Sequence, residues 1–302
     1  MLSEKRAPSG FLDVRQVRAV EFIRSMHGGS YPKLLRCSDG AHYVVKFQNN
    51  PQGIRILANE LLAALLASAA GLPVPQPAIV EVPWELVWRN NELTMGRGSS
   101  RIPCCPGLCF GSAYAADAVH PSDSGEVRDW LRPQYLDRVE NISDFIGMLA
   151  FDKWIGNADV RQVIFVRRNR ELPFRAYMID NGLSFNGPAW DFQIRPRLGL
   201  CFQRFVYSRV AGMDVFEPWI VRIQKTMNSK TLQNAARMLP TSWYGENRGA
   251  LWNLLARLED RISKLRKLLE ITREMSWEFF PAWATCSHSK FNSWNHARGL
   301  AD

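Results

Sequence analysis

The chain has 302 residues, 46% of them hydrophobic, so it can bury one large core or form two lobes around a cleft. Its 38 Lys and Arg against 29 Asp and Glu give a formal net charge of +9. This excess favours anionic partners such as nucleotides, and nucleic acid is less favoured because the charge is spread along the chain. No apolar run approaches the ~18 residues of a membrane span, and no hydrophobic signal region follows Met1. We therefore expect a cytoplasmic protein without membrane contact.

One hairpin is predicted near the start of the chain. Residues 14–24 alternate apolar and charged side chains, which fits a strand or a short helix. Gly28-Gly29-Ser30 then forms a flexible turn. The runs 34–37 and 42–47 flank Asp39-Gly40, a pair typical of a tight turn between strands. The second of these strands ends close to Lys46.

A strongly apolar helix is predicted over residues 53–70, because the run ends at Gly71 with Pro73 beyond it. Residues 78–82 predict another strand. We expect residues 1–88 to form a small first lobe of β-sheet with this one helix.

The second lobe is expected over residues 89–275. Residues 89–135 are rich in Asn, Gly, Ser and Pro and predict loops at the junction of the lobes. Further elements are a helix at 142–155, a hairpin of strands 163–166 and 174–179, and helices at roughly 215–228, 230–238 and 246–275. Residues 276–302 carry several aromatic residues and form either a strap packed on the body or a partly disordered tail.

Six cysteines are present, and three of them lie in Cys104-Cys105-Pro106-Gly107-Leu108-Cys109. A zinc site usually has a second ligand pair at a matching spacing. None follows here, so a reduced, partly buried cysteine loop is favoured over a zinc site.

Lys46 and Glu60 form the first half of a candidate active site. Strand alternation places Lys46 on the face opposite Val45. Glu60 is embedded among leucines and alanines, where an unpaired carboxylate would be costly, so a cationic partner is expected and Lys46 is the candidate. The alternative is that Lys46 is solvated and Glu60 lies on the solvent face of its helix.

Asp159 and Asp180 form the second half. Asp159 follows the turn-like Gly156-Asn157-Ala158, and Asp180 lies at a strand end before Asn181-Gly182. Because the hairpin lies between them, both carboxylates can stand at one end of the same ribbon. Asp159 would orient an attacking hydroxyl, whereas Asp180 would hold Mg²⁺, which takes one or two carboxylates together with phosphate oxygens. Asp152, seven residues before Asp159, is expected to pair with Lys153 or Arg161 or to cap structure.

Backbone N–H groups of Gly28, Gly29 and Ser30 could approach the phosphates of a nucleotide, because glycine leaves no side chain in the way. A plain hairpin turn is the alternative. Glu81 and Val82, at the end of the strand-like run 78–82, are further candidates for nucleotide contacts.

With these residues in place, the chain resembles the HipA-like kinases, a bacterial branch of the protein-kinase-like fold. The resemblance covers roughly residues 15–270. It rests on Gly28-Gly29-Ser30, on Tyr43-Val44-Val45-Lys46-Phe47, on Asn59-Glu60-Leu61 with Gly71-Leu72-Pro73-Val74-Pro75, on Phe151 to Asp159, and on Ile179-Asp180-Asn181-Gly182.

The resemblance implies an α+β, two-lobed kinase that binds ATP and Mg²⁺ and phosphorylates a protein hydroxyl. Lys46 would contact phosphates, Glu60 would position Lys46, Asp159 would be the catalytic aspartate and Asp180 the metal ligand. The family usually has an asparagine five residues after the catalytic aspartate as a second metal ligand, but Ile164 stands there and Gln162 is the substitute candidate. A protein substrate or regulator is the expected partner.

Three functions are therefore considered for the chain. The first is an ATP- and Mg²⁺-dependent protein kinase. The second is a nucleotide-binding pseudokinase on the same fold, and the third is a module that binds nucleic acid or a partner protein through the basic surface and the aromatic tail.

Overall fold

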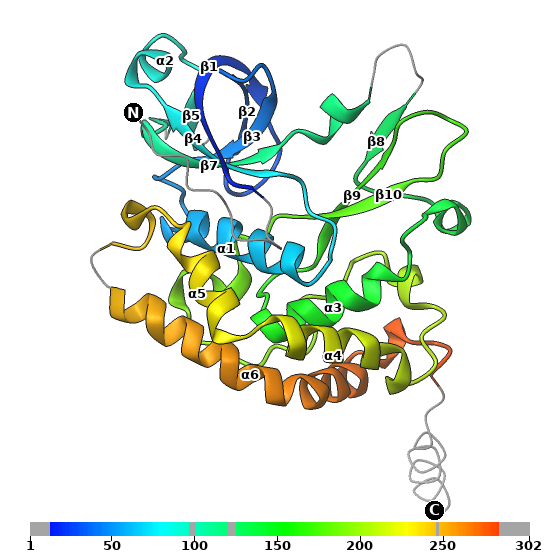
Figure 1. Ribbon diagram of the computed structural model, residues 1–302. Helices are drawn as coiled ribbons and strands as arrows, with labels where there is room; N and C mark the ends of the chain where they lie inside the picture. The colour runs from blue at the N-terminus through cyan, green and yellow to red at the C-terminus, as the bar shows by residue number, and fades with distance from the viewer. Residues whose placement is uncertain (1–12, 97–100, 120–124, 246–247, 284–302) are drawn as a thin grey trace, which may run out of the picture.

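The computed structural model describes residues 13–96, 101–119, 125–245 and 248–283. A β-barrel forms one lobe, and helices with a small sheet form the other (Figure 1). The molecule is therefore of the α+β class, with a β-rich first lobe and a mainly helical second lobe, as the sequence predicts.

Five strands close the barrel in the order β1-β2-β3-β7-β4. Neighbouring strands are antiparallel, except that β1 pairs parallel with β4 and so closes the ring. Side chains that alternate along the strands, among them Leu35, Tyr43 and Val45, fill the barrel with an apolar core of its own. The strands are β1 (Arg15–Ser25), β2 (Lys33–Cys37), β3 (His42–Lys46), β4 (Pro77–Val82) and β7 (Gly107–Ala113).

Strand β7 corrects the boundary between the lobes that was expected at residue 88. It is one of the five strands of the barrel wall and pairs with β3 on one side and β4 on the other. The first lobe therefore extends to Ala113 and also contains α2 (Trp84–Trp88) and the short pair β5 (Thr94–Met95) and β6 (Ile102–Pro103). The glycines of β7 conceal the strand in the sequence. Gly111 is required there, because a Cβ atom would come within 2.5 Å of Val80. The cysteine loop contributes to this region, with Cys104 and Cys109 buried in the barrel and Cys105 exposed.

Helix α1 (Arg55–Ala69) lies between the barrel and the second lobe (Figure 1). Twelve of its residues are buried, from Ile56 to Ala67, which explains its apolar character on all sides. Its leucines belong to the same core cluster as the helices of the second lobe. Glu60 is therefore held in a helix that is packed against both lobes.

The second lobe combines helices with a three-stranded sheet, β8-β9-β10. Helix α3 packs against α6, and Trp154 of α3 donates a hydrogen bond to the carbonyl of Leu258 at 2.9 Å. The predicted hairpin and helices are confirmed to within a few residues. The elements are α3 (Asp144–Ile155), α4 (Glu217–Thr226), α5 (Ser229–Arg237), α6 (Arg248–Met275), β8 (Glu126–Arg128), β9 (Gln162–Arg167) and β10 (Arg175–Ile179).

The segment after α6 packs on the body as far as it is described. Phe280 is 3% exposed, and its ring lies 5.6 Å from that of Tyr207. Trp283 contacts Phe216, with ring centroids 6.3 Å apart. The strap interpretation therefore holds for residues 276–283, and residues 284–302 lie outside the described residues. Among the described helices, none has the length and the apolar character needed to cross a membrane.

Candidate active site

Lys46 lies at the centre of a buried ion cluster. It ends β3, and because Val45 points into the barrel, the Lys46 side chain points out of it toward α1. Its ammonium group contacts the carboxylate of Glu60 on α1 and donates to Asp180 Oδ1 at 2.7 Å. These three residues come from β3, α1 and the loop after β10. The structure thus brings together the amine and two of the acids that the sequence predicts.

The cluster keeps Lys46 cationic. Burial alone would lower the pKa of Lys46, but the negative charges of Glu60 and then Asp180 outweigh it, and the pKa lies above its ordinary value. Burial likewise acts to raise the pKa of Asp180, yet Lys46 and Arg161 hold it below its ordinary value. The side chain of Asp180 remains 35% exposed, against 8% for Lys46. A charged carboxylate therefore faces the solvent beside a fixed ammonium group.

Glu60 also fixes the loop that carries Asp180. Its second carboxylate oxygen accepts a hydrogen bond from the backbone N–H of Asn181 at 2.9 Å. The next residue must be glycine, because a Cβ atom on Gly182 would lie 2.6 Å from Ile56 and 3.1 Å from Glu60. Asp180 itself has φ = 56°, a left-handed conformation that aspartate adopts more readily than most residues.

Asp159 lies at the same end of the β9–β10 ribbon as Asp180. Ile179 pairs with Gln162 in the ribbon, and the backbone N–H of Ala158 donates to Leu183 at 2.9 Å, which joins the two acidic loops. One oxygen of Asp159 accepts a hydrogen bond from the backbone N–H of Val160, and the Gln162 amide reaches the other at 3.5 Å. Gln162, at the start of β9, therefore has its amide directed at Asp159.

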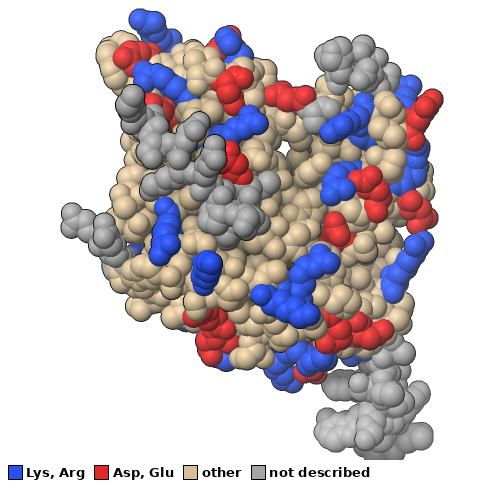
Figure 2. Space-filling model, viewed as in Figure 1, with Lys and Arg blue, Asp and Glu red and all other residues tan. Residues whose placement is uncertain are grey.

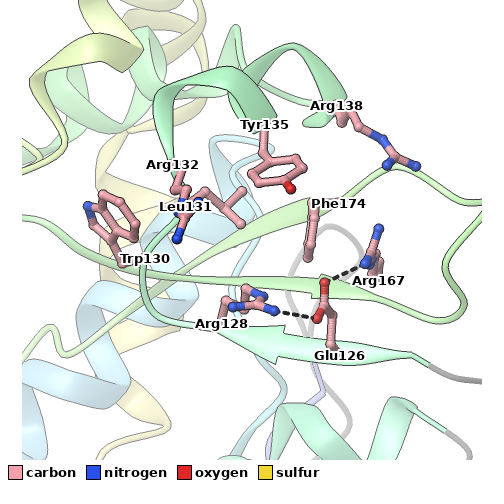
Figure 3. Close-up of a pocket in the computed structure, with 9 residues that line it drawn as sticks. All are labelled: Glu126, Arg128, Trp130, Leu131, Arg132, Tyr135, Arg138, Arg167 and Phe174. Carbon is pink, nitrogen blue, oxygen red and sulfur yellow. Dashed lines mark hydrogen bonds and ion pairs between the residues drawn. The ribbon is translucent and has the colours of Figure 1, made fainter.

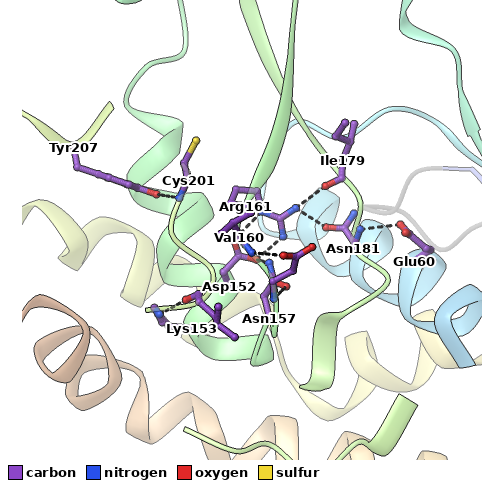
Figure 4. A network of polar contacts seen from close by, with 12 residues as sticks. Glu60, Asp152, Lys153, Asn157, Val160, Arg161, Ile179, Asn181, Cys201 and Tyr207 are labelled. Atoms are coloured by element: carbon purple, nitrogen blue, oxygen red, sulfur yellow. Dashed lines mark hydrogen bonds and ion pairs between the residues drawn. The ribbon is translucent and has the colours of Figure 1, made fainter. Parts of the chain in front are cut away.

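Arg161 lies at the centre of a buried hydrogen-bond network beside the site, a role that the sequence alone does not reveal (Figure 4). It is completely buried and forms a two-pronged ion pair with Asp152 of α3, at 2.7 and 2.5 Å. The same guanidinium group donates to the carbonyl of Ile179 and to Asn181. Arg161 thereby ties the loop after Asp159 to the loop after β10, and the expected pairing of Asp152 with Arg161 is confirmed.

Asn59 is a second residue whose role the sequence alone does not reveal. Its buried amide donates to the carbonyls of Gly182, Ser184 and Gly187, and its oxygen accepts from the indole of Trp190. It thus holds the segment that follows Asp180 against α1. The signal in the sequence was a polar side chain in an otherwise apolar helix.

The glycine turn lies at the same end of the barrel as Lys46, since Ser25 pairs with Lys33 and Lys33 with Val45. Gly28 has φ = 138°, and a Cβ atom on Gly29 would lie 3.8 Å from the side chain of Gln52. Ser30 is 4% exposed. Within the described residues, Lys46 forms its hydrogen bonds with Glu60 and Asp180 and none with this turn.

The side chains of two further candidates for nucleotide contacts are directed away from Lys46. Val82 is 1% exposed because its side chain belongs to the barrel core. Glu81 points outward instead, and it pairs at the surface with Arg18 of β1 at 2.8 Å. The alternation of β4 therefore leaves neither side chain beside Lys46.

The donor set fits a polyphosphate with a divalent cation. Lys46 supplies a fixed positive charge, and Asp180 supplies a partly exposed carboxylate with Asp159 and Gln162 nearby. In the described part of the chain, no group of three or more His, Cys, Asp and Glu residues is placed to hold a metal without other ligands. Mg²⁺ does not need such a cage, because it is commonly bound by one or two carboxylates together with phosphate oxygens.

The fold is similar to that of solved kinase structures. The Helicobacter pylori proinflammatory kinase CtkA aligns with a TM-score of 0.55 at 13% identity, over 87% of this chain and 100% of that one. Two structures of the Golgi casein kinase, one with Mn and ADP bound, align with TM-scores of 0.46 and 0.45 at 13% identity, each over 91% of this chain and 77% of theirs. The likeness to CtkA shows a protein-kinase-like fold.

The family follows from the sequence itself. The profile of the HipA-like kinase family matches residues 19–278, which include both lobes and the four site residues Lys46, Glu60, Asp159 and Asp180. The chain belongs to this family, and the resemblance noted above is confirmed. No curated protein matches the chain.

Proposed function

We propose that this protein is an ATP- and Mg²⁺-dependent kinase that transfers the γ-phosphoryl group to a serine or threonine hydroxyl of a protein. The observation that carries the proposal is the ammonium group of Lys46 held between Glu60 and Asp180. Family membership supports a kinase, and the cluster supports a polyphosphate substrate. The partner protein is proposed only by its class.

Each residue has a role that its surroundings favour. Lys46 neutralises phosphate charge, and Glu60 keeps its amine in place. Asp159 accepts a hydrogen bond from the attacking hydroxyl, while Asp180, with Gln162 as a further oxygen donor, would hold Mg²⁺. Bound Mg²⁺ supplies charge neutralisation for the transferring group. The Arg161 network keeps the two acidic loops in register during this chemistry.

One observation favours a second function, a nucleotide-binding pseudokinase. Ile164 replaces the asparagine that the family places five residues after the catalytic aspartate, and Gln162 is longer and less constrained. A weaker second metal ligand would lower the stabilisation of charge in the transition state. This alternative shares the nucleotide site and differs in turnover alone.

The test compares phosphoryl transfer from γ-labelled ATP, with Mg²⁺, between the native protein and Asp159→Asn. Autophosphorylation and a generic protein acceptor serve as readouts. We expect labelled product from the native protein and a loss of at least ~100-fold in Asp159→Asn, because the base contributes about 10²–10⁴ in rate. Asp214→Asn, an exposed aspartate before α4, is the matched control and should retain full activity.

Three outcomes would contradict the kinase proposal. Equal labelling by the native protein and Asp159→Asn would show that Asp159 is not the catalytic base. A rise in melting temperature with Mg²⁺ and ATP, without any labelled product, would establish the pseudokinase instead. The absence of both product and thermal shift would exclude both functions.

A further inference from the structure

A cavity lies on the small sheet of the second lobe (Figure 3). It has a volume of about 430 Å³, within the range typical of small-ligand sites. Arg167, at the far end of β9, lines it, whereas Gln162 begins that strand beside Asp159. The two residues are five positions apart along the strand, which corresponds to roughly 16 Å. The cavity is therefore distinct from the candidate active site.

The lining of this cavity is strongly basic. Its charged residues are four arginines and one glutamate, a formal charge of +3: Arg128, Arg132, Arg138, Arg167 and Glu126. The hydrogen bond from Arg128, and then the positive charge of Arg167, hold the pKa of Glu126 below its ordinary value against the effect of burial, so the glutamate stays ionised. The excess positive charge is consequently a property of the cavity at neutral pH.

The arginines are only partly satisfied by the protein. Glu126 pairs with Arg128 at 2.8 Å and with Arg167 at 2.5 Å. Within the described residues, the guanidinium group of Arg132 has no hydrogen-bond or ion-pair partner. Free guanidinium N–H groups at a concave surface are donors that match the oxygens of a phosphate.

Arg167 adds an independent observation. Its side chain is 13% exposed and lies over the ring of Phe174, with 4.6 Å between the guanidinium carbon and the ring centroid. This stacking fixes the guanidinium group at the wall of the cavity. Its Nε is buried and has no hydrogen-bond acceptor among the described residues. Buried donors are nearly always paired, so an unpaired Nε at the wall of a cavity is unusual.

We propose that this cavity binds a phosphoserine or phosphothreonine side chain of a protein partner. A phosphate carries a charge of about −2 at neutral pH and three acceptor oxygens, which suits an excess of positive charge and unpaired arginine donors. Trp130 and Tyr135, 47% and 40% exposed at the same cavity, offer apolar surface to the residues beside the phosphate. The proposal concerns binding and does not require phosphoryl transfer by this chain.

A phosphopeptide is favoured over nucleic acid by the form of the site. Nucleic acid is bound along extended basic tracks that follow its backbone. The cavity is local, and Glu126 stands between two of its arginines. On the face shown in Figure 2, Lys and Arg are interspersed with Asp and Glu and form no continuous track.

The experiment measures binding by fluorescence anisotropy, with the Asp159→Asn protein as the background so that no turnover occurs. The probes are a labelled peptide library with a fixed central phosphoserine, the same library with serine, and a single-stranded oligonucleotide. We expect the phosphoserine library to bind at least about tenfold more tightly than the serine library, because hydrogen bonds to charged groups are worth this factor or more.

Variants assign the binding to the cavity. Arg132→Ala changes an exposed side chain without a partner, so folding should be unaffected, and binding should weaken by about tenfold. Arg237→Ala, an exposed arginine at the end of α5, is the matched control and should bind within about twofold of its parent. Equal binding of the two peptide libraries, no effect of Arg132→Ala, or tighter binding of the oligonucleotide would each overturn the proposal.

Discussion

Two buried lysines, one in each lobe, show how surroundings decide what a charge can do. Lys46 is 7% exposed and Lys153 is 6% exposed. Lys46 contacts two carboxylates, whereas Lys153 donates to backbone carbonyls of the segment after β10, including Pro196 at 2.7 Å. Burial lowers the pKa of Lys153 to about 7, with Asp152 opposing and Arg261 adding to the effect, while the pKa of Lys46 is raised.

The difference lies in the acidic partners. Asp152 is adjacent to Lys153 in the chain, but its carboxylate is engaged by Arg161. Lys153 therefore anchors the segment around Pro196 to α3 without a counter-ion in contact. Lys46, in contrast, is a permanent cation beside a partly exposed Asp180. Of these two lysines, Lys46 is suited to binding a polyphosphate, whereas Lys153 has a structural role.

The largest expected effect is the loss of activity in Lys46→Met. Removal of the ammonium group should lower single-turnover phosphoryl transfer by about 10²–10³ or more, because a fixed donor to developing charge is lost. Lys153→Met, a buried lysine replaced in the same way, is the matched control and should keep most of the activity. Circular dichroism would verify that both variants are folded. Similar rates in the two variants would contradict the assignment of a catalytic role to Lys46 and a structural role to Lys153.

The next effect concerns stability. Asp152→Ala should lower the free energy of unfolding by about 3–5 kcal/mol, since it leaves Arg161 buried without its counter-ion. Urea denaturation would measure the loss. The control is Asp137→Ala, which breaks an ion pair with Arg209 whose side chains are 74% and 83% exposed, and it should cost at most about 1 kcal/mol. If both variants lost the same stability, the buried Asp152–Arg161 pair would contribute no more to the stability of the fold than an exposed ion pair does.

The sequence was informative where a residue broke its local pattern. Glu60 within an apolar helix required a cation, and the alternation of β3 identified which lysine faced it. Strand β7 was concealed because Gly107 and Gly111 are poor strand residues. Gly111 is packed closely against Val80 of β4, and Gly107 has φ = 111° and lies against the side chain of Gln48, which a single sequence does not reveal. The same limit applies to Val82, whose inward direction depends on barrel closure, and to Arg161, whose three partners come from α3, β10 and the following loop.

The smallest effect is a pH dependence that separates the two lysines. The pKa of Lys153 is about 7 in the folded protein against an ordinary 10.5, so between these values the unfolded chain binds the additional proton. The free energy of unfolding of the native protein should therefore rise with pH relative to Lys153→Met, by about 2 kcal/mol between pH ~7.5 and ~9.5. Below the folded pKa both states are protonated, and the difference between the variants should be constant. Parallel urea titrations at several pH values would measure the divergence, and curves that stay parallel over the whole range would show that Lys153 keeps its charge when buried, as Lys46 does.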